Sequence, residues 1–351
     1  MRCALLGMLA ALMGCSSGDN AQTMLDDYVW RVSNVLDTQT PSTQRPRAIS
    51  VPRIRERRLA TSEFKIDLLD FLSMQGCDLG YLLGYRNSSL GLVMPTSQRL
   101  VYEVNFVRIA QQCLPELEQS DSTFATELKD ILRQKRNELP RHIWNAIFAG
   151  PEFAELMSTS TTLAETGAED ASDAALQAIL EIESLTMALL PNESELLLDD
   201  KKLESALAII HRNPATGRAL LRFQALTSSL DATRSMLERA IADKRLCPMG
   251  KTTPRGQYLR NVFDLYYAGK VQPYVVLAYR TDRELLEALN RIRRALDVEI
   301  SAPMQRYWAQ TLSLGAGSLF GDLDSALNRH TLAWQQALGA CQLMPGSNIQ
   351  Q

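Results

Sequence analysis

Cysteine and histidine supply the most reactive side chains of this sequence, which contains six cysteines and three histidines. A cysteine thiolate is a nucleophile and a metal ligand, and histidine is the common acid–base group near neutral pH. Zinc sites use closely spaced pairs of these residues, and neither type shows such a spacing here. We therefore expect no metal and no other cofactor, and we expect the cysteines to take part in other chemistry.

The cysteine at position 15 follows an apolar stretch at the amino terminus. After Arg2 there is an uncharged run of twelve residues, from Cys3 to Gly14. As a helix this run would be about 18 Å long, too short for a hydrocarbon core of about 30 Å. A positive charge, a short apolar core and small residues at its end are typical of an export signal. The alternative is a buried N-terminal helix that ends at the Gly-Cys-Ser-Ser-Gly run.

The sequence LMGC that ends at Cys15 resembles the lipobox of bacterial lipoproteins. The resemblance implies that residues 1–14 are a signal peptide removed before Cys15, whose thiol and new amino group then carry acyl chains. Two or more such chains hold a protein firmly on a membrane. Ser16 at the next position implies export to the outer membrane, facing the periplasm. Residues 15–23 would form a lipidated tether, in which the eight residues after Cys15 reach at most about 28 Å.

Four cysteines remain in the mature chain, and an even number in an oxidising compartment indicates two disulfides. Four cysteines allow three pairings. We favour Cys77–Cys113 together with Cys247–Cys341, because this pairing closes the shorter loops. In the chain-entropy model, loops of this size contribute about 4 and 5 kcal/mol to stability, respectively.

Apolar residues follow a helical period along most of the chain. Helices are predicted at about 23–36, 62–72, 97–113, 121–138, 171–190, 194–212, 216–245, 282–297 and 317–342. The fourth of these is expected to end at Pro140, and the run Tyr274–Leu277 is the one convincing β-like segment. We therefore predict an all-α fold, with a helical domain at residues 24–345.

Two stretches of this domain are predicted to lack helix. Residues 37–52 contain three prolines and are expected to form an extended linker. Residues 158–170 are predicted to form a loop, at which two subdomains could meet.

The histidines are the candidate acid–base catalysts. His142 follows Pro140 and is predicted near the start of a helix, His211 ends a helix, and His330 lies on an apolar stripe that favours burial. None lies in a zinc-protease or nucleophile-elbow motif. We therefore predict no catalytic residue and favour a non-catalytic binding module. The alternative is an envelope hydrolase whose site is assembled from distant residues, with His142 or His211 as the base.

A glycine-rich segment precedes a cationic one. Gly76, Gly80 and Gly84 recur at every fourth position, a spacing that gives a helix a smooth groove for close packing. The sequence RNSS at 86–89 then offers a cation and three hydrogen-bonding side chains. We expect an ordered turn held by the Asn and Ser side chains, with an anion site as the alternative.

Charge is segregated along the chain. The segment from Arg45 to Arg58, here called the arginine strip, contains six arginines and one glutamate. From His142 to Asp200 there is no Lys or Arg, but there are twelve Asp and Glu. The strip and the acidic segment could be separately solvated, the strip could lie on the acidic helices, or it could contact anionic lipid headgroups. The net charge of −3 gives no basic excess, so no nucleic-acid partner is expected.

Three segments carry a resemblance to a known family: LDDYVWRV at 25–32, the stretch from Cys77 to Cys113, and LPRHIWNAIFAGPEF at 139–153. They resemble Gram-negative predicted lipoproteins that are catalogued only as a domain of unknown function. The resemblance implies export, acylation and the Cys77–Cys113 bridge, but no activity or substrate. The expected partners are the membrane, through acylated Cys15, and an envelope protein, lipid or glycan.

Overall fold

The computed structural model describes residues 21–62, 77–120, 122–159, 169–190, 196–244 and 246–346. Within these ranges every regular element is helical and there is no β-strand, which confirms the predicted all-α fold. The predicted signal peptide and Cys15 lie outside the described residues. So do the body of the helix predicted after Ser62 and most of the predicted loop at 158–170, and the subdomain boundary there stays a prediction.

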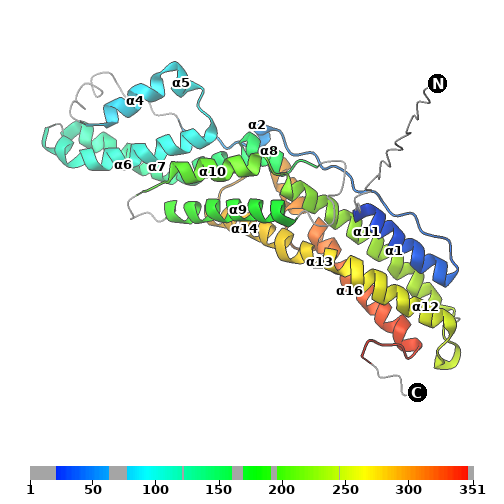
Figure 1. The fold of residues 1–351 in the computed structure, drawn as a ribbon. Coiled ribbons are helices and arrows are strands. Elements are labelled where there is room, and N and C mark those ends of the chain that lie inside the picture. Colours follow the sequence, from blue (N-terminus) through cyan, green and yellow to red (C-terminus); the bar gives the residue numbers. More distant parts are fainter. Residues whose placement is uncertain are drawn as a thin grey trace, which may run out of the picture.

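The molecule is elongated, with two end groups of helices joined by a middle group (Figure 1). The first end group consists of α4 (Leu79–Asn87), α5 (Ser89–Leu92), α6 (Thr96–Ser120) and α7 (Ser122–Phe148). The middle group consists of α2 (Ile54–Arg57), α8 (Pro151–Leu156), α9 (Glu169–Leu189), α10 (Asp200–His211), α14 (Arg283–Leu296) and α15 (Ala302–Thr311). The second end group consists of α1 (Ala21–Leu36), α11 (Ala215–Ala242), α12 (Pro254–Val262), α13 (Gln272–Leu277) and α16 (Leu319–Ala340).

The second end group is built around α11, which packs against α16 and α1. Apolar residues of α11 that recur near heptad spacing are buried, namely Phe223, Leu226, Leu230 and Leu237. Phe223 meets Phe320 edge to face at 5.4 Å between ring centroids. In the middle of the molecule, Trp144 and Phe148 of α7 pack against Trp308 of α15. The buried apolar residues form one continuous core. No helix in the described part of the chain is long and apolar enough to cross a bilayer.

The predicted end of a helix at Pro140 is wrong, because α7 continues through this proline to Phe148. A proline inside a helix removes one backbone hydrogen bond. Here the continued turns bury Ile143, Trp144 and Phe148, and the Trp144 indole donates to the carbonyl of Arg57 at 2.8 Å. Tertiary packing therefore outweighs the local penalty.

Two other predictions of secondary structure need correction. The β-like run Tyr274–Leu277 is helical and forms part of α13, between the π-helical segments η2 (Phe263–Val271) and η3 (Ala278–Asp282). Tyr274 and Val275 are buried in this helix, so packing overrides their β propensity. Helix α10 begins at Asp200 rather than near 194, because the Asp199 side chain caps it by accepting from the amide of Lys202 at 3.0 Å.

The predicted linker is extended and runs along α11. The amide of Gln44 donates to Ser228 Oγ at 2.7 Å. Arg47 exchanges two backbone hydrogen bonds with the Gln224 side chain, each of 3.0 Å. These contacts satisfy part of the linker backbone without a sheet partner, and they lead the chain from α1 to α2.

Two cysteine pairs lie at disulfide distance. They are the two pairs that were predicted because they close the shorter loops. The Cα atoms of Cys77 and Cys113 are 5.9 Å apart, and this bridge joins the segment before α4 to α6. The Cα atoms of Cys247 and Cys341 are 5.2 Å apart, which joins the segment after α11 to the end of α16. A Cβ at Gly256 would come within 2.9 Å of Cys247 Sγ, so α12 packs closely on this bridge only because it has glycine there.

Candidate functional site

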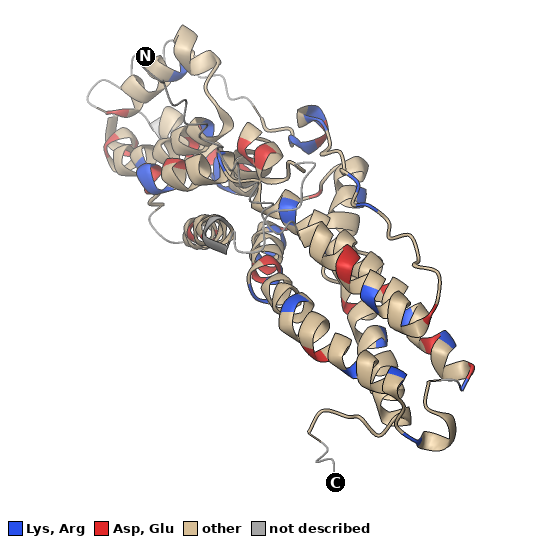
Figure 2. Ribbon diagram, turned by 45° about the vertical axis from the view of Figure 1, so that its right-hand side comes forward, with Lys and Arg blue, Asp and Glu red and all other residues tan. Residues whose placement is uncertain are grey.

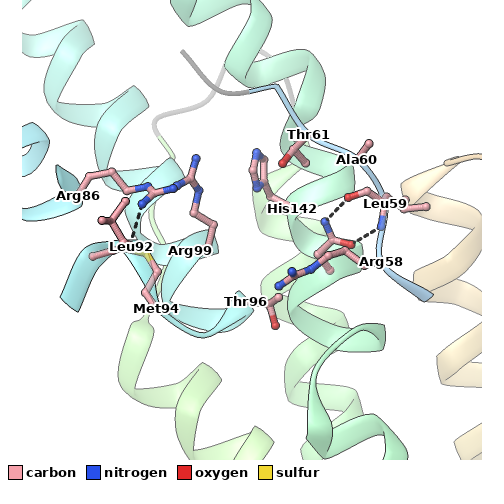
Figure 3. Close-up of a pocket in the computed structure, with 12 residues that line it drawn as sticks. Arg58, Leu59, Ala60, Thr61, Arg86, Leu92, Met94, Thr96, Arg99 and His142 are labelled. Atoms are coloured by element: carbon pink, nitrogen blue, oxygen red, sulfur yellow. Dashed lines mark hydrogen bonds between the residues drawn. The ribbon is translucent and has the colours of Figure 1, made fainter. Parts of the chain in front are cut away.

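A cavity of about 310 Å³ lies where the segment after α2 faces helices α4 to α7 (Figure 3). We call it the arginine pocket. It is lined by Arg58, Leu59, Ala60, Thr61, Arg86, Gly91, Leu92, Met94, Thr96, Arg99, His142 and Asn145. Among these described lining residues there are three arginines and one histidine but no carboxylate, so the pocket is electropositive.

The four cationic or titratable side chains come from four separate segments. Arg86 lies at the end of α4, Arg99 in the first turns of α6 and His142 on α7, while Arg58 directly follows α2. Arg86 and Arg99 lie on one side of the cavity, and Arg58 and His142 lie on the other (Figure 3). The fold therefore makes the pocket from residues that are far apart in the sequence.

Hydrogen bonds hold the Arg58 side of the pocket against α7. The amide of Leu59 donates to Asn145 Oδ1 at 2.7 Å, and Asn145 Nδ2 donates to the carbonyl of Leu59 at 2.9 Å. Ser62 donates to Glu138 twice, through its amide at 3.0 Å and through its hydroxyl at 2.6 Å. This extended segment is thus fixed at both ends, which places Arg58 at the cavity.

The opposite side is a tight turn between α4 and α5. Ser88 Oγ accepts from the amide of Gly91 at 3.1 Å and donates to the carbonyl of Tyr85 at 2.7 Å. Arg86 donates to the carbonyl of Gly91 at 2.9 Å. A Cβ at Gly91 would lie 2.2 Å from the Tyr85 oxygen, so the turn requires glycine. The predicted ordered turn is present, with Ser88 as its hydrogen-bonding residue, and it also directs Arg86 to the pocket.

A buried group of charges lies beneath the pocket. Glu103 is 2% exposed, with Arg99 Nε 2.8 Å from one carboxylate oxygen and Lys135 Nζ 2.5 Å from the other. Burial lowers the pKa of Lys135 and that of His142, and Glu103 opposes both shifts. The second buried nitrogen of Arg99, Nη1, has no hydrogen-bond acceptor among the described residues. Arg99 therefore has one buried donor without a partner in the described part of the chain.

The three histidines occupy different environments. His142 Nε2 is 4.0 Å from Glu103, too far for a hydrogen bond. His211 is exposed at the end of α10, as predicted, and does not line the pocket. His330 is completely buried, with Nε2 at 2.8 Å from the Tyr28 hydroxyl and 3.1 Å from Trp334 Nε1. His142 also lies well inside α7 rather than near a helix start, because this helix continues through Pro140.

The arrangement at His142 differs from a hydrolase triad. Both oxygens of the nearest carboxylate, Glu103, are engaged by Arg99 and Lys135. The side-chain hydroxyls of the described lining are those of Thr61 and Thr96, and no serine is among them. A nucleophile, base and orienting acid in mutual contact, which such chemistry requires, are therefore not assembled around His142 among the described residues. These residues also include no cluster of His, Cys, Asp or Glu suited to a metal ion.

The arginine strip does not lie on the acidic helices as a continuous surface. Figure 2 shows its basic residues along the extended linker and α2. Arg57 is the buried member and donates to the carbonyls of Phe148 at 2.7 Å and Gly150 at 3.0 Å. Within the described ranges, the ion pair of the strip joins Arg45 to Asp26 at 3.8 Å. Most of the strip is solvated, and Arg58 joins the pocket.

The acidic helices pair with other parts of the fold instead. Glu183 of α9 accepts two hydrogen bonds from Arg291 of α14, at 2.6 and 3.0 Å. Glu181 lies 3.3 Å from Lys202 of α10. These two carboxylates of the acidic segment therefore find counter-ions within the middle group of helices.

The fold and the site define an all-helical protein with two cysteine pairs at disulfide distance and an electropositive pocket. The chain belongs to the family described as a protein of unknown function (DUF3080), whose family model matches residues 25–345. No curated protein and no solved structure matches the chain. The family match indicates no activity, so any function has to be argued from the site.

Proposed function

We propose that the protein is a lipoprotein held by acylated Cys15 on the periplasmic face of the outer membrane. Its helical body acts as a non-catalytic binding module, and the arginine pocket receives an anionic ligand. The LMGC sequence supports the anchor. The placement of two cysteine pairs at disulfide distance is consistent with an oxidising compartment.

The observation that carries the ligand class is the composition of the pocket. Arg58, Arg86 and Arg99 line it. Arg99 is paired with the buried carboxylate of Glu103, whereas the described lining contains no carboxylate for Arg58 or Arg86. Guanidinium groups bind carboxylate and phosphate oxygens through charge-assisted, often bidentate hydrogen bonds. An anion with several oxygens fits this donor set.

Binding is favoured over the alternative, an envelope hydrolase. His142 borders the pocket and is the one histidine that does. Burial lowers its pKa, so the imidazole is neutral at pH 7, and its neighbour Glu103 is occupied by two cations. In its neutral state, His142 can accept one hydrogen bond from a ligand or donate one to it.

The anion-binding proposal is tested by calorimetric titration of the full-length protein, in neutral detergent, with inorganic phosphate. Arg58→Glu and Arg86→Glu each remove a charged hydrogen-bond donor, and each is expected to raise the Kd at least about tenfold. The matched control is Arg55→Glu, because Arg55 is an exposed arginine of α2 that does not line the pocket. Wild-type protein that binds no phosphate, or a control that weakens binding as much as the pocket variants, would contradict the proposal.

A further inference from the structure

The outer surface of α4 and α5 exposes a group of large apolar side chains. We call it the apolar patch, and its members, between 52% and 84% exposed, are Tyr81, Tyr85, Leu90, Leu92 and Val93. Four of them lie on α4 and α5, two short helices that pack against each other at one end of the molecule (Figure 1), and Val93 directly follows α5. Exposed apolar groups of this kind mark interaction surfaces for proteins or membranes.

The exposure of the patch does not come from a loosely attached element. Leu79 and Leu83, on the inner side of α4, are buried where this helix packs on α6. The Cys77–Cys113 pair connects the segment before α4 to α6. The inner side chains of α4 are therefore covered where this helix packs on α6. The outer side chains are not covered by any described residue.

The apolar patch and the arginine pocket are adjacent. Leu92 belongs to both, and Arg86, which lines the pocket, directly follows Tyr85. Met94, next to Val93, also lines the pocket. A ligand in the pocket would therefore present its anionic group to the arginines and any attached apolar part to the patch.

We propose that the apolar patch inserts into the interfacial layer of the membrane and that the arginine pocket binds the phosphate of an anionic lipid headgroup. This inference rests on the proposed function, which is the binding of an anionic ligand, and it identifies that ligand as a lipid headgroup. Tyrosine with aliphatic residues beside arginine suits the interfacial layer, where rings and chains meet headgroups. Because α1 begins at Ala21, the chain between Cys15 and this helix reaches at most about 18 Å and would keep the body near such a surface.

A single anionic lipid molecule would contact both the arginine pocket and the apolar patch. The described lining of the pocket is electropositive, so it complements a phosphate. The patch contains no charged side chain, so it complements acyl chains. A free phosphate would satisfy the arginines but leave the patch exposed.

The test is hydrogen–deuterium exchange of the full-length acylated protein in nanodiscs of phosphatidylcholine, with and without phosphatidylglycerol. Amides of residues 79–94 are expected to exchange at least about fivefold more slowly with phosphatidylglycerol, which corresponds to the contribution of one basic residue at an anionic surface. Leu90→Ser with Leu92→Ser is expected to remove this protection. The matched control is Leu197→Ser, because Leu197 is 64% exposed outside the patch.

The pocket is tested separately in the same nanodiscs. Arg58→Glu is expected to abolish the difference between the two lipid compositions, whereas Arg55→Glu should preserve it. Equal exchange in both lipids, or protection that survives both the patch and the pocket variants, would overturn the inference. If inorganic phosphate binds in the titration but the nanodiscs give no protection, the lipid is wrong and the anion site stands. If phosphate also fails to bind, the proposed function fails with it.

Discussion

The double variant Cys247→Ser with Cys341→Ser is expected to lose about 5 kcal/mol in its free energy of unfolding, because the bridge closes a loop with a sequence separation of 94 residues. The pair joins the segment after α11 to the end of α16 and so ties the C-terminal ends of these two helices together. Denaturation by guanidinium, followed by circular dichroism, measures the loss. An oxidised wild type and a double variant of equal stability would contradict this prediction.

The other bridge provides the comparison. Cys77 and Cys113 close a shorter loop, with a separation of 36 residues, and the same replacement there is expected to cost about 4 kcal/mol. The loss should also be local, since this bridge joins the segment before α4 to α6. A larger loss at Cys77–Cys113 than at Cys247–Cys341 would show that loop length does not govern the two contributions.

The second large effect concerns acid. Burial lowers the pKa of His330 to about 3, from an ordinary value of 6.5. Between these two pH values the unfolded chain binds a proton at this residue and the folded chain does not. Its contribution to stability is therefore complete above pH 6.5 and declines by about 1.4 kcal/mol for each unit of pH below it. Over the whole interval the loss from this residue is expected to approach about 5 kcal/mol.

Replacement of the histidine isolates this effect. His330→Gln keeps a group that can accept from Tyr28 or Trp334 but cannot titrate, so its stability should fall less steeply with pH than that of the wild type. The matched control is His211→Gln, since His211 is exposed and solvated in both states. Denaturant titrations at several pH values measure the slopes. A slope that His330→Gln leaves unchanged would mean that other groups cause the acid sensitivity.

The helical architecture was predictable because amphipathic periodicity reports burial directly. The helix at about 216–245 and the buried position of His330 followed from spacing alone. The errors arose where packing outweighs a local rule. Pro140 does not end α7, since the turns after it bury Trp144 and Phe148. Tyr274–Leu277 is helical because its neighbours continue as helix on both sides.

The arginine pocket was only partly visible in the sequence. Arg86 was a candidate anion ligand and Arg58 belonged to the arginine strip, but nothing in the spacing connected them. Their meeting depends on the hydrogen bonds that fix residues 58–62 to α7. Glu103 and Arg99 were missed, although the separation of four residues between them is a helical ion-pair signal. The ion pair is important because Glu103 is buried, and this burial can be recognised only in the tertiary structure.

Mass spectrometry of the protein purified from its native membrane tests the lipoprotein anchor most directly. We expect the N-terminal peptide to begin at Cys15 and to carry acyl chains on its sulfur and its amino group. A polypeptide that still begins at Met1, with an unmodified thiol at Cys15, would contradict the account.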